Sequence, residues 1–278
     1  MKAIYDQLSA DCSKMTTQRY STSFAFGIYF LKKDLRPAIY SIYGFVRLAD
    51  EIVDTFHNFD KTYLLRKFKE DTFEAIEQGI SLNPVLHAFQ HVVNYYKIDN
   101  KLITQFLKSM EMDLEKQEYT PALYEEYILG SAEVVGLMCL KVFTKGEDQE
   151  YIRLKPYAMK LGAAFQKINF LRDVKADHQD LSRNYFPNVN LAAFCDNQKR
   201  EIEQEIKEDL KIALQGIKML PAESRNGVYL AYIYYQKLFN KIQRLSAERI
   251  MIERIRIPNR IKIGLMLDSM IRHKLNAI

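Results

Sequence analysis

Residues 166–177 place polar side chains at helical spacing within a segment whose other positions are mostly apolar. At 3.6 residues per turn, one helical face receives Gln166, Asn169, Asp173 and Asp177, with Arg172 at its flank. Apolar residues such as Ile168 and Leu171 cover other faces, which predicts a helix buried nearly all round. Two acids in such a helix are costly unless a cation or hydrogen bonds satisfy them. Because a four-residue acid repeat is also common on exposed helices, this stripe alone does not establish a site.

A second acidic stripe lies in residues 43–54. Helical spacing aligns Tyr43, Arg47, Asp50 and Asp54, and the residues between the two aspartates are mostly apolar. Aspartates and one asparagine, without His or Cys, form an oxygen-ligand set that suits Mg²⁺ better than zinc. Two such stripes facing each other would clamp a metal-bridged diphosphate, with the arginines binding phosphate oxygens.

In this order and spacing, the two acidic segments resemble those of the squalene/phytoene synthases, which join two prenyl diphosphates head to head. The resemblance runs from about Tyr20 to about Lys262. It also includes three other segments: Tyr20 to Phe24, Tyr127 with Val135-Gly136, and Ser182 to Pro187. The sequence departs from the family pattern at Thr22, where Lys is usual, and at Ser182, where Gly is usual. Glu51 replaces the second acid of an Asp pair and keeps its charge.

The resemblance implies an all-α isoprenoid synthase fold with helices surrounding a central apolar cavity. It further implies that residues 1–278 form a single domain. The implied metal is Mg²⁺, with Mn²⁺ as an alternative, and its ligands are Asp50, Asp54, Asn169, Asp173 and Asp177. The four aspartates and Tyr127 are the implied catalytic residues. The implied substrate-binding residues are Ser21, Ser23, Tyr43, Arg47, Val135, Gly136, Gln166, Asn169, Arg172, Tyr235 and Arg260.

Composition agrees with a helical globular protein. The chain has 278 residues, 48% of them hydrophobic, which is enough for a sizeable core. Only 10 glycines and 7 prolines argue against a turn-rich all-β fold. The three cysteines, Cys12, Cys139 and Cys195, are far apart and fit a reducing compartment. The histidines do not cluster with them, so we do not expect zinc.

The ends of the chain bear on localisation. The first residues have no apolar signal-peptide region, and no run of about 18 apolar residues exists, so we expect a cytoplasmic protein. From Lys241 onward there are nine Lys/Arg and three Asp/Glu, a local charge of +6 within a total of +5. This excess favours peripheral association with the inner face of a membrane. The basic residues alternate with Ile, Leu and Met, which argues against nucleic-acid binding. The sequence leaves the oligomeric state open.

Helical periodicity runs through the chain, without a sustained strand pattern. The expected helices span residues 9–20, 34–56 with Asp34 as cap, 60–78, 83–96, 100–116, 120–144, 150–177, 198–219, 221–253 and a last one ending near 275. Residues 21–31 are expected to form a turn, 180–190 an irregular flap, and 108–116 a solvated face. Gly130 and Gly136 predict close packing of helix 120–144, which by resemblance lines the channel for the prenyl tails.

The predicted reaction is the condensation of two geranylgeranyl diphosphates to phytoene, in carotenoid biosynthesis. We do not expect NADPH, although the lack of a GxGxxG motif is weak support because the family binds NADPH without a Rossmann unit. The first alternative is a dehydrosqualene, hydroxysqualene or squalene synthase that uses farnesyl diphosphate. A chain-elongating or cyclising synthase is disfavoured by the pattern QxxNxxRDxxxD. A non-catalytic lipid-binding or assembly factor is disfavoured because all four aspartates are present.

Overall fold

The structure, a computed structural model, describes residues 1–115, 119–179, 183–187 and 189–258. All regular secondary structure in these residues is helical, so the prediction of an all-α fold is confirmed. The α-helices are α1 (Lys2–Tyr20), α2 (Thr22–Tyr29), α3 (Arg36–Asp54), α4 (Lys61–Gln78), α5 (Pro84–Tyr96), α6 (Asn100–Met112), α7 (Pro121–Ile128), α8 (Val134–Phe143), α9 (Asp148–Gln179), α10 (Asp196–Met219), α11 (Ala222–Gln243) and α12 (Ala247–Ile252). Three short helices accompany them: η1 (Lys33–Leu35), the π-helix η2 (Leu129–Glu133) and η3 (Leu191–Ala193).

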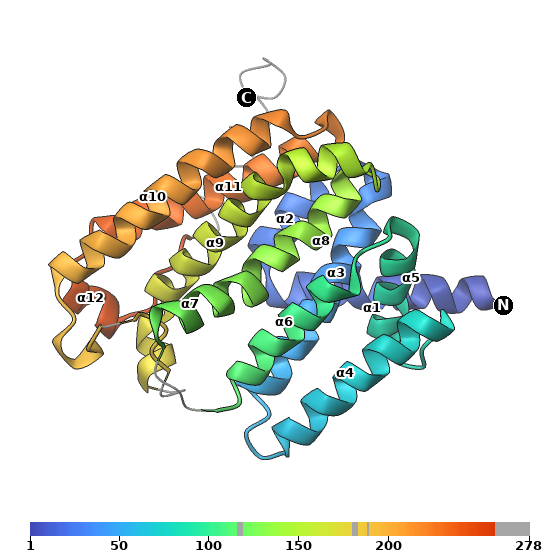
Figure 1. The fold of residues 1–278 in the computed structure, drawn as a ribbon, viewed down its shortest axis with the longest axis horizontal. Helices are drawn as coiled ribbons and strands as arrows, with labels where there is room; N and C mark the ends of the chain where they lie inside the picture. Colours follow the sequence, from blue (N-terminus) through green and yellow to red (C-terminus); the bar gives the residue numbers. More distant parts are fainter. Residues whose placement is uncertain (116–118, 180–182, 188, 259–278) are drawn as a thin grey trace.

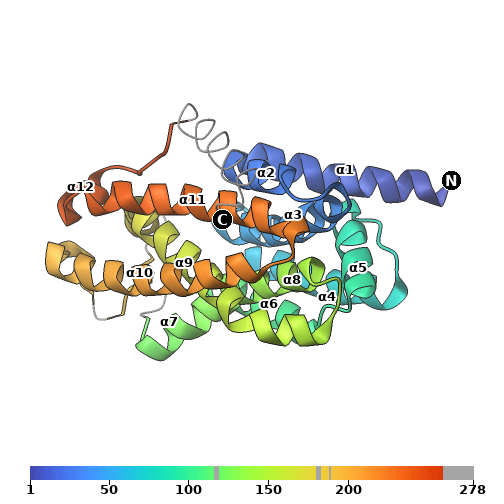
Figure 2. The ribbon, with the colours of Figure 1, turned by 90° about the horizontal axis from the view of Figure 1, so that it is seen from above.

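Helices α3 and α9 carry the two acidic segments and run through the middle of the molecule. Helix α10 packs along α9 with α11 beside it, whereas α1 and α5 pack against α3 (Figures 1 and 2). One core cluster centres on Phe45 of α3, which is fully buried and stacks on Phe89 at 3.9 Å between ring centroids. A second cluster surrounds α9 and includes the fully buried Leu171. The two cores therefore fix the positions of the helices that carry the predicted site.

Several predicted boundaries differ from the structure. Residues 21–31 do not form a turn: α2 occupies most of this stretch because the Ser21 hydroxyl oxygen accepts a hydrogen bond from Phe24 N and caps the helix. The prediction that Asp34 caps the next helix is also wrong, since η1 precedes α3 and no side chain caps it. The last predicted helix, to residue 275, lies outside the described residues. Within them, none of the helices is long and apolar enough to span a bilayer.

The predicted helix 120–144 is divided by the π-helix η2. At Gly130, an added Cβ atom would lie 2.6 Å from the carbonyl oxygen of Gln105. At Gly162 of α9, it would lie 2.6 Å from the carbonyl oxygen of Ala132, within η2. These glycines therefore allow two backbones to approach each other closely, which confirms the predicted packing of Gly130 and places η2 directly against α9.

Candidate active site

Both acidic stripes lie on the wall of one polar cavity of about 690 Å³. Helix α3 contributes Tyr43, Arg47, Asp50 and Asp54, and helix α9 contributes Gln166, Asn169, Arg172, Asp173 and Asp177. Ser21 and Ser23 line the same cavity from the start of α2, as does Tyr127 at the end of α7. The structure thus brings together residues far apart in sequence, such as Ser21 and Asp177.

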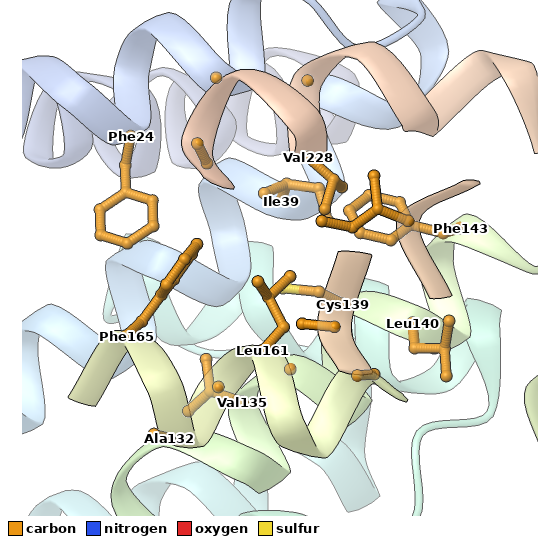
Figure 3. Close-up of a pocket in the computed structure, with 18 of the residues that line it drawn as sticks. Phe24, Ile39, Ala132, Val135, Cys139, Leu140, Phe143, Leu161, Phe165 and Val228 are labelled. Atoms are coloured by element: carbon orange, nitrogen blue, oxygen red, sulfur yellow. The ribbon is translucent and has the colours of Figure 1, made fainter. Parts of the chain in front are cut away.

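A second cavity, of about 310 Å³, adjoins the first and is almost entirely apolar (Figure 3). Val135 and Gly136 lie on its wall, together with side chains such as Ile39, Leu161 and Val228. Five residues line both cavities: Phe24, Tyr43, Gln166, Asn169 and Tyr235. The polar cavity therefore opens directly into the apolar cavity.

Three aromatic rings mark the junction of the two cavities. Phe165 stacks on Tyr235 with ring centroids 3.8 Å apart, and Phe24 lies 5.9 Å from Tyr235. Figure 3 shows Phe24 and Phe165 facing each other at one end of the apolar cavity. We call Phe24, Phe165 and Tyr235 the aromatic neck. The Tyr235 hydroxyl donates to Asn169 Oδ1 at 3.2 Å, and because burial raises its pKa to about 12 it remains a neutral donor.

The acids crowd one another across the polar cavity. Burial, followed by the charge of Asp54, raises the pKa of Asp50 to about 7. Burial, followed by the charges of Asp173 and Asp54, raises the pKa of Asp177 to about 8. Asp54 is on α3 and Asp177 is on α9, so carboxylates of the two helices repel each other through space. A cation bound between the helices would offset this repulsion and favour the charged form of both carboxyl groups.

Arginines pair with several of these carboxylates. Asp50 and Glu51 both accept hydrogen bonds from Arg47. Asp173 accepts from Arg172 Nε at 3.0 Å and lies 2.7 Å from Arg254 Nε. Among the described residues, no group of three or more His, Cys, Asp and Glu side chains is arranged to hold a metal ion by itself. A cation would therefore draw its ligands from both helices, and the carboxylate and amide oxygens present are of the kind that Mg²⁺ prefers.

Sequence reasoning missed several residues of the cavity, among them Asp113, Arg183, Tyr185 and Arg254. The prediction of a solvated face at 108–116 is wrong for Asp113, whose side chain is 3% exposed. It accepts hydrogen bonds from Tyr127 Oη at 2.6 Å and Tyr185 Oη at 3.0 Å. Arg183 and Tyr185 belong to the segment Ser182 to Pro187, which resembles the family, and this resemblance could have identified both as site residues. The predicted Arg260 lies outside the described residues.

The chain matches one known protein family along most of its length. The family model for squalene/phytoene synthase matches residues 17–260. The phytoene synthase of Arthrospira platensis is 28% identical over 260 residues, covering 84% of this chain and 83% of the relative. The 4,4'-diapophytoene synthase of Staphylococcus haemolyticus is 25% identical over 236 residues, covering 82% of this chain and 79% of the relative.

Solved structures show the same fold. A dehydrosqualene synthase in complex with ligand superposes with a TM-score of 0.83 at 20% identity, covering 98% of both chains. Squalene synthase HpnC from Alicyclobacillus acidocaldarius superposes with a TM-score of 0.75 at 18% identity, covering 87% of this chain and 95% of that one. The predicted isoprenoid synthase fold is thereby confirmed. The family match over most of the sequence, together with this fold, shows that the chain belongs to the squalene/phytoene synthase family.

Proposed function

We propose that this protein condenses two geranylgeranyl diphosphates head to head to form phytoene. The observation that carries the proposal is the pair of joined cavities, one acid-lined and one apolar. This pair fits a substrate with a charged diphosphate and a long hydrocarbon tail. Two of the relatives are a phytoene synthase and a diapophytoene synthase, which supports the class of product but leaves the tail length to experiment.

We further propose that Mg²⁺, replaceable by Mn²⁺, binds at Asp50, Asp54, Asn169, Asp173 and Asp177. The repulsion between Asp54 and Asp177 supports this assignment, because a cation between the helices would offset it. When bound, the metal supplies charge stabilisation to the leaving diphosphate. Phosphate oxygens would be bound by arginines and hydroxyls at the cavity: Ser21, Ser23, Arg47, Arg172 and Arg254.

The apolar cavity and the aromatic neck would handle the cations that this chemistry requires. Loss of the first diphosphate leaves an allylic cation, which the double bond of the second substrate attacks to give a tertiary cation. This cation loses a proton to the released diphosphate as the three-membered ring closes, which gives a cyclopropyl diphosphate. That intermediate loses its diphosphate, rearranges and gives up a proton, for which the released diphosphate is an acceptor. The faces of Phe24, Phe165 and Tyr235 would stabilise positive charge. The surrounding apolar side chains would exclude the water that traps such cations.

Product analysis tests the proposal. Purified protein is incubated with Mg²⁺ and either farnesyl or geranylgeranyl diphosphate, with and without NADPH. We expect the C20 substrate to give a product with a conjugated triene that absorbs in the near ultraviolet, unchanged by NADPH. A C30 product from farnesyl diphosphate alone would reassign the tail length. A product without this absorption, formed only with NADPH, would favour a squalene-type synthase, and no product from either substrate would refute the proposal.

A further inference from the structure

Arg183 is held between two carboxylates of different exposure. Its Nη1 donates to Asp54 Oδ1 at 2.7 Å, and its Nη2 donates to the backbone oxygen of Asp113 at 2.9 Å. Its Nε lies 3.6 Å from Asp113 Oδ1. The Asp54 side chain is 31% exposed, whereas that of Asp113 is 3% exposed. Both partners of the guanidinium line the cavity, but Asp54 is partly exposed whereas Asp113 is buried in its wall.

Asp113 has the contacts of a permanent partner. Tyr127 and Tyr185 donate to its two carboxylate oxygens, and Arg183 reaches both its side chain and its backbone oxygen. Burial alone would lower the pKa of Arg183, but the charges of Asp113 and Asp54 raise it above its ordinary value. Arg183 is consequently a cation at any physiological pH, and it needs a carboxylate nearby.

We propose that Asp113 is a positioning residue that retains Arg183 when a divalent cation binds Asp54. The inference rests on the proposed function, because it assumes that Asp54 is a metal ligand. A metal ion on Asp54 competes with Arg183 Nη1 for the same oxygens. Asp113 keeps the guanidinium partnered through Nε and Nη2, so the exchange does not leave an unpaired buried charge.

Retention of Arg183 also keeps residues 183–185 in place. Arg183 N donates to the backbone oxygen of Asp177 at 2.7 Å, which joins this segment to the second acidic stripe. The Tyr185 ring stacks on Phe170 of α9 at 4.3 Å between centroids. If Arg183 left its position, these contacts beside Asp177 would be disturbed as the metal arrived. Asp113 thus allows a metal ion to bind Asp54 while the residues that line the metal site keep their positions.

Mn²⁺ binding without substrate tests the inference. The free Mn²⁺ signal in electron paramagnetic resonance gives the Kd of the wild type, Asp113→Asn, Arg183→Gln and the double variant. We expect Asp113→Asn to raise the Kd about tenfold, because Asp54 becomes the only carboxylate partner of Arg183 and the metal must compete harder for it. Arg183→Gln removes the competitor and should lower the Kd. In the Arg183→Gln background, Asp113→Asn should then change the Kd little.

A control variant and the possible outcomes distinguish the positioning role of Asp113 from the proposed metal site. Tyr185→Phe removes a hydrogen bond to Asp113 and a weak one from Arg183 Nη1, but it leaves the charges of Asp113 and Arg183 in place, so the Kd should stay unchanged. An unchanged Kd in Asp113→Asn would overturn the positioning role. An equal Asp113→Asn effect with and without Arg183 would also overturn it, since Asp113 would then attract the metal directly. If Asp113→Asn does not fold, a raised Kd in Arg183→Gln overturns it. Absence of Mn²⁺ binding by the wild type would instead refute the proposed metal site itself.

Discussion

The contact between α9 and the π-helix η2 can be tested with a single methyl group. In Gly162→Ala, the new Cβ would lie 2.6 Å from the oxygen of Ala132, 2.9 Å from its carbonyl carbon and 3.1 Å from Glu133 Cα. All three are backbone atoms, so no change of rotamer can relieve the clash. Real Cβ contacts essentially never fall below 3.0 Å, so one of the two helices must move by at least about 0.4 Å, the difference between 3.0 and 2.6 Å.

The expected loss of stability follows from two opposing effects. Overpacking of this kind costs about 1–3 kcal/mol, and the rigid backbone contact favours the upper end of that range. Replacing Gly by Ala inside a helix returns about 1 kcal/mol, which leaves a net destabilisation of about 2 kcal/mol. For 278 residues, the entropy of unfolding is about 0.6 kcal/mol per kelvin, so the Tm should fall by about 3 °C.

Thermal unfolding followed by circular dichroism measures this shift. Gly27→Ala is the matched control, because its Cβ would lie 3.2 Å from the oxygen of Gly227 and needs a smaller adjustment. We expect a smaller decrease in Tm for this variant than for Gly162→Ala. Turnover should also fall in Gly162→Ala, since Gln166 lies one turn further along α9 and moves with it. A Tm equal to or above that of the wild type would refute the close contact between α9 and η2.

Three other predictions concern the metal, a thiol and the membrane. Asp50→Asn and Asp173→Asn should each lower kcat by more than about 10³-fold with an unchanged circular dichroism spectrum, and full activity in EDTA would contradict the metal assignment. At pH 8, iodoacetamide should alkylate the exposed Cys195 but not Cys139. Burial raises the pKa of the Cys139 thiol to about 12, which keeps this thiol protonated. A Cys139 adduct in mass spectrometry would contradict this prediction. Binding to liposomes should rise with anionic lipid and fall with salt, because residues 241–278 carry a charge of +6; indifference to both would exclude this mode of association.

The parts of the site that depend on local geometry were predictable. Helical spacing alone aligns Asp50 with Asp54 and Asp173 with Asp177, since the register within a helix depends only on residues close in sequence. The start of α2 also has a local signal, because Ser21 precedes a short apolar run and serine is a favoured cap, but this segment was predicted to be a turn. That the two stripes face each other was inferred from their shared chemistry, and the structure places them on one cavity.

Features that depend on distant partners were not predictable from the sequence. Asp113 lies in a stretch of mixed charge, and its donors Tyr127 and Tyr185 are 14 and 72 residues away. Arg254 reaches Asp173 across 81 residues, from an irregular segment after α12. The π-helix η2 lies where α9 approaches within backbone contact, about thirty residues further along the chain. Local propensity contains no information about such approaches.

The two joined cavities also have a consequence for how turnover ends. In the proposed reaction, a substrate would be anchored twice, by its charged group in the polar cavity and by its tail beyond the aromatic neck. A hydrocarbon product has no charged group left, so only the apolar cavity of about 310 Å³ still favours its retention. Such a hydrocarbon is poorly soluble in water, so its release from the cavity depends on partition into a lipid phase. The proposed product would therefore leave by direct transfer into lipid, and the supply of lipid would set the rate of each cycle.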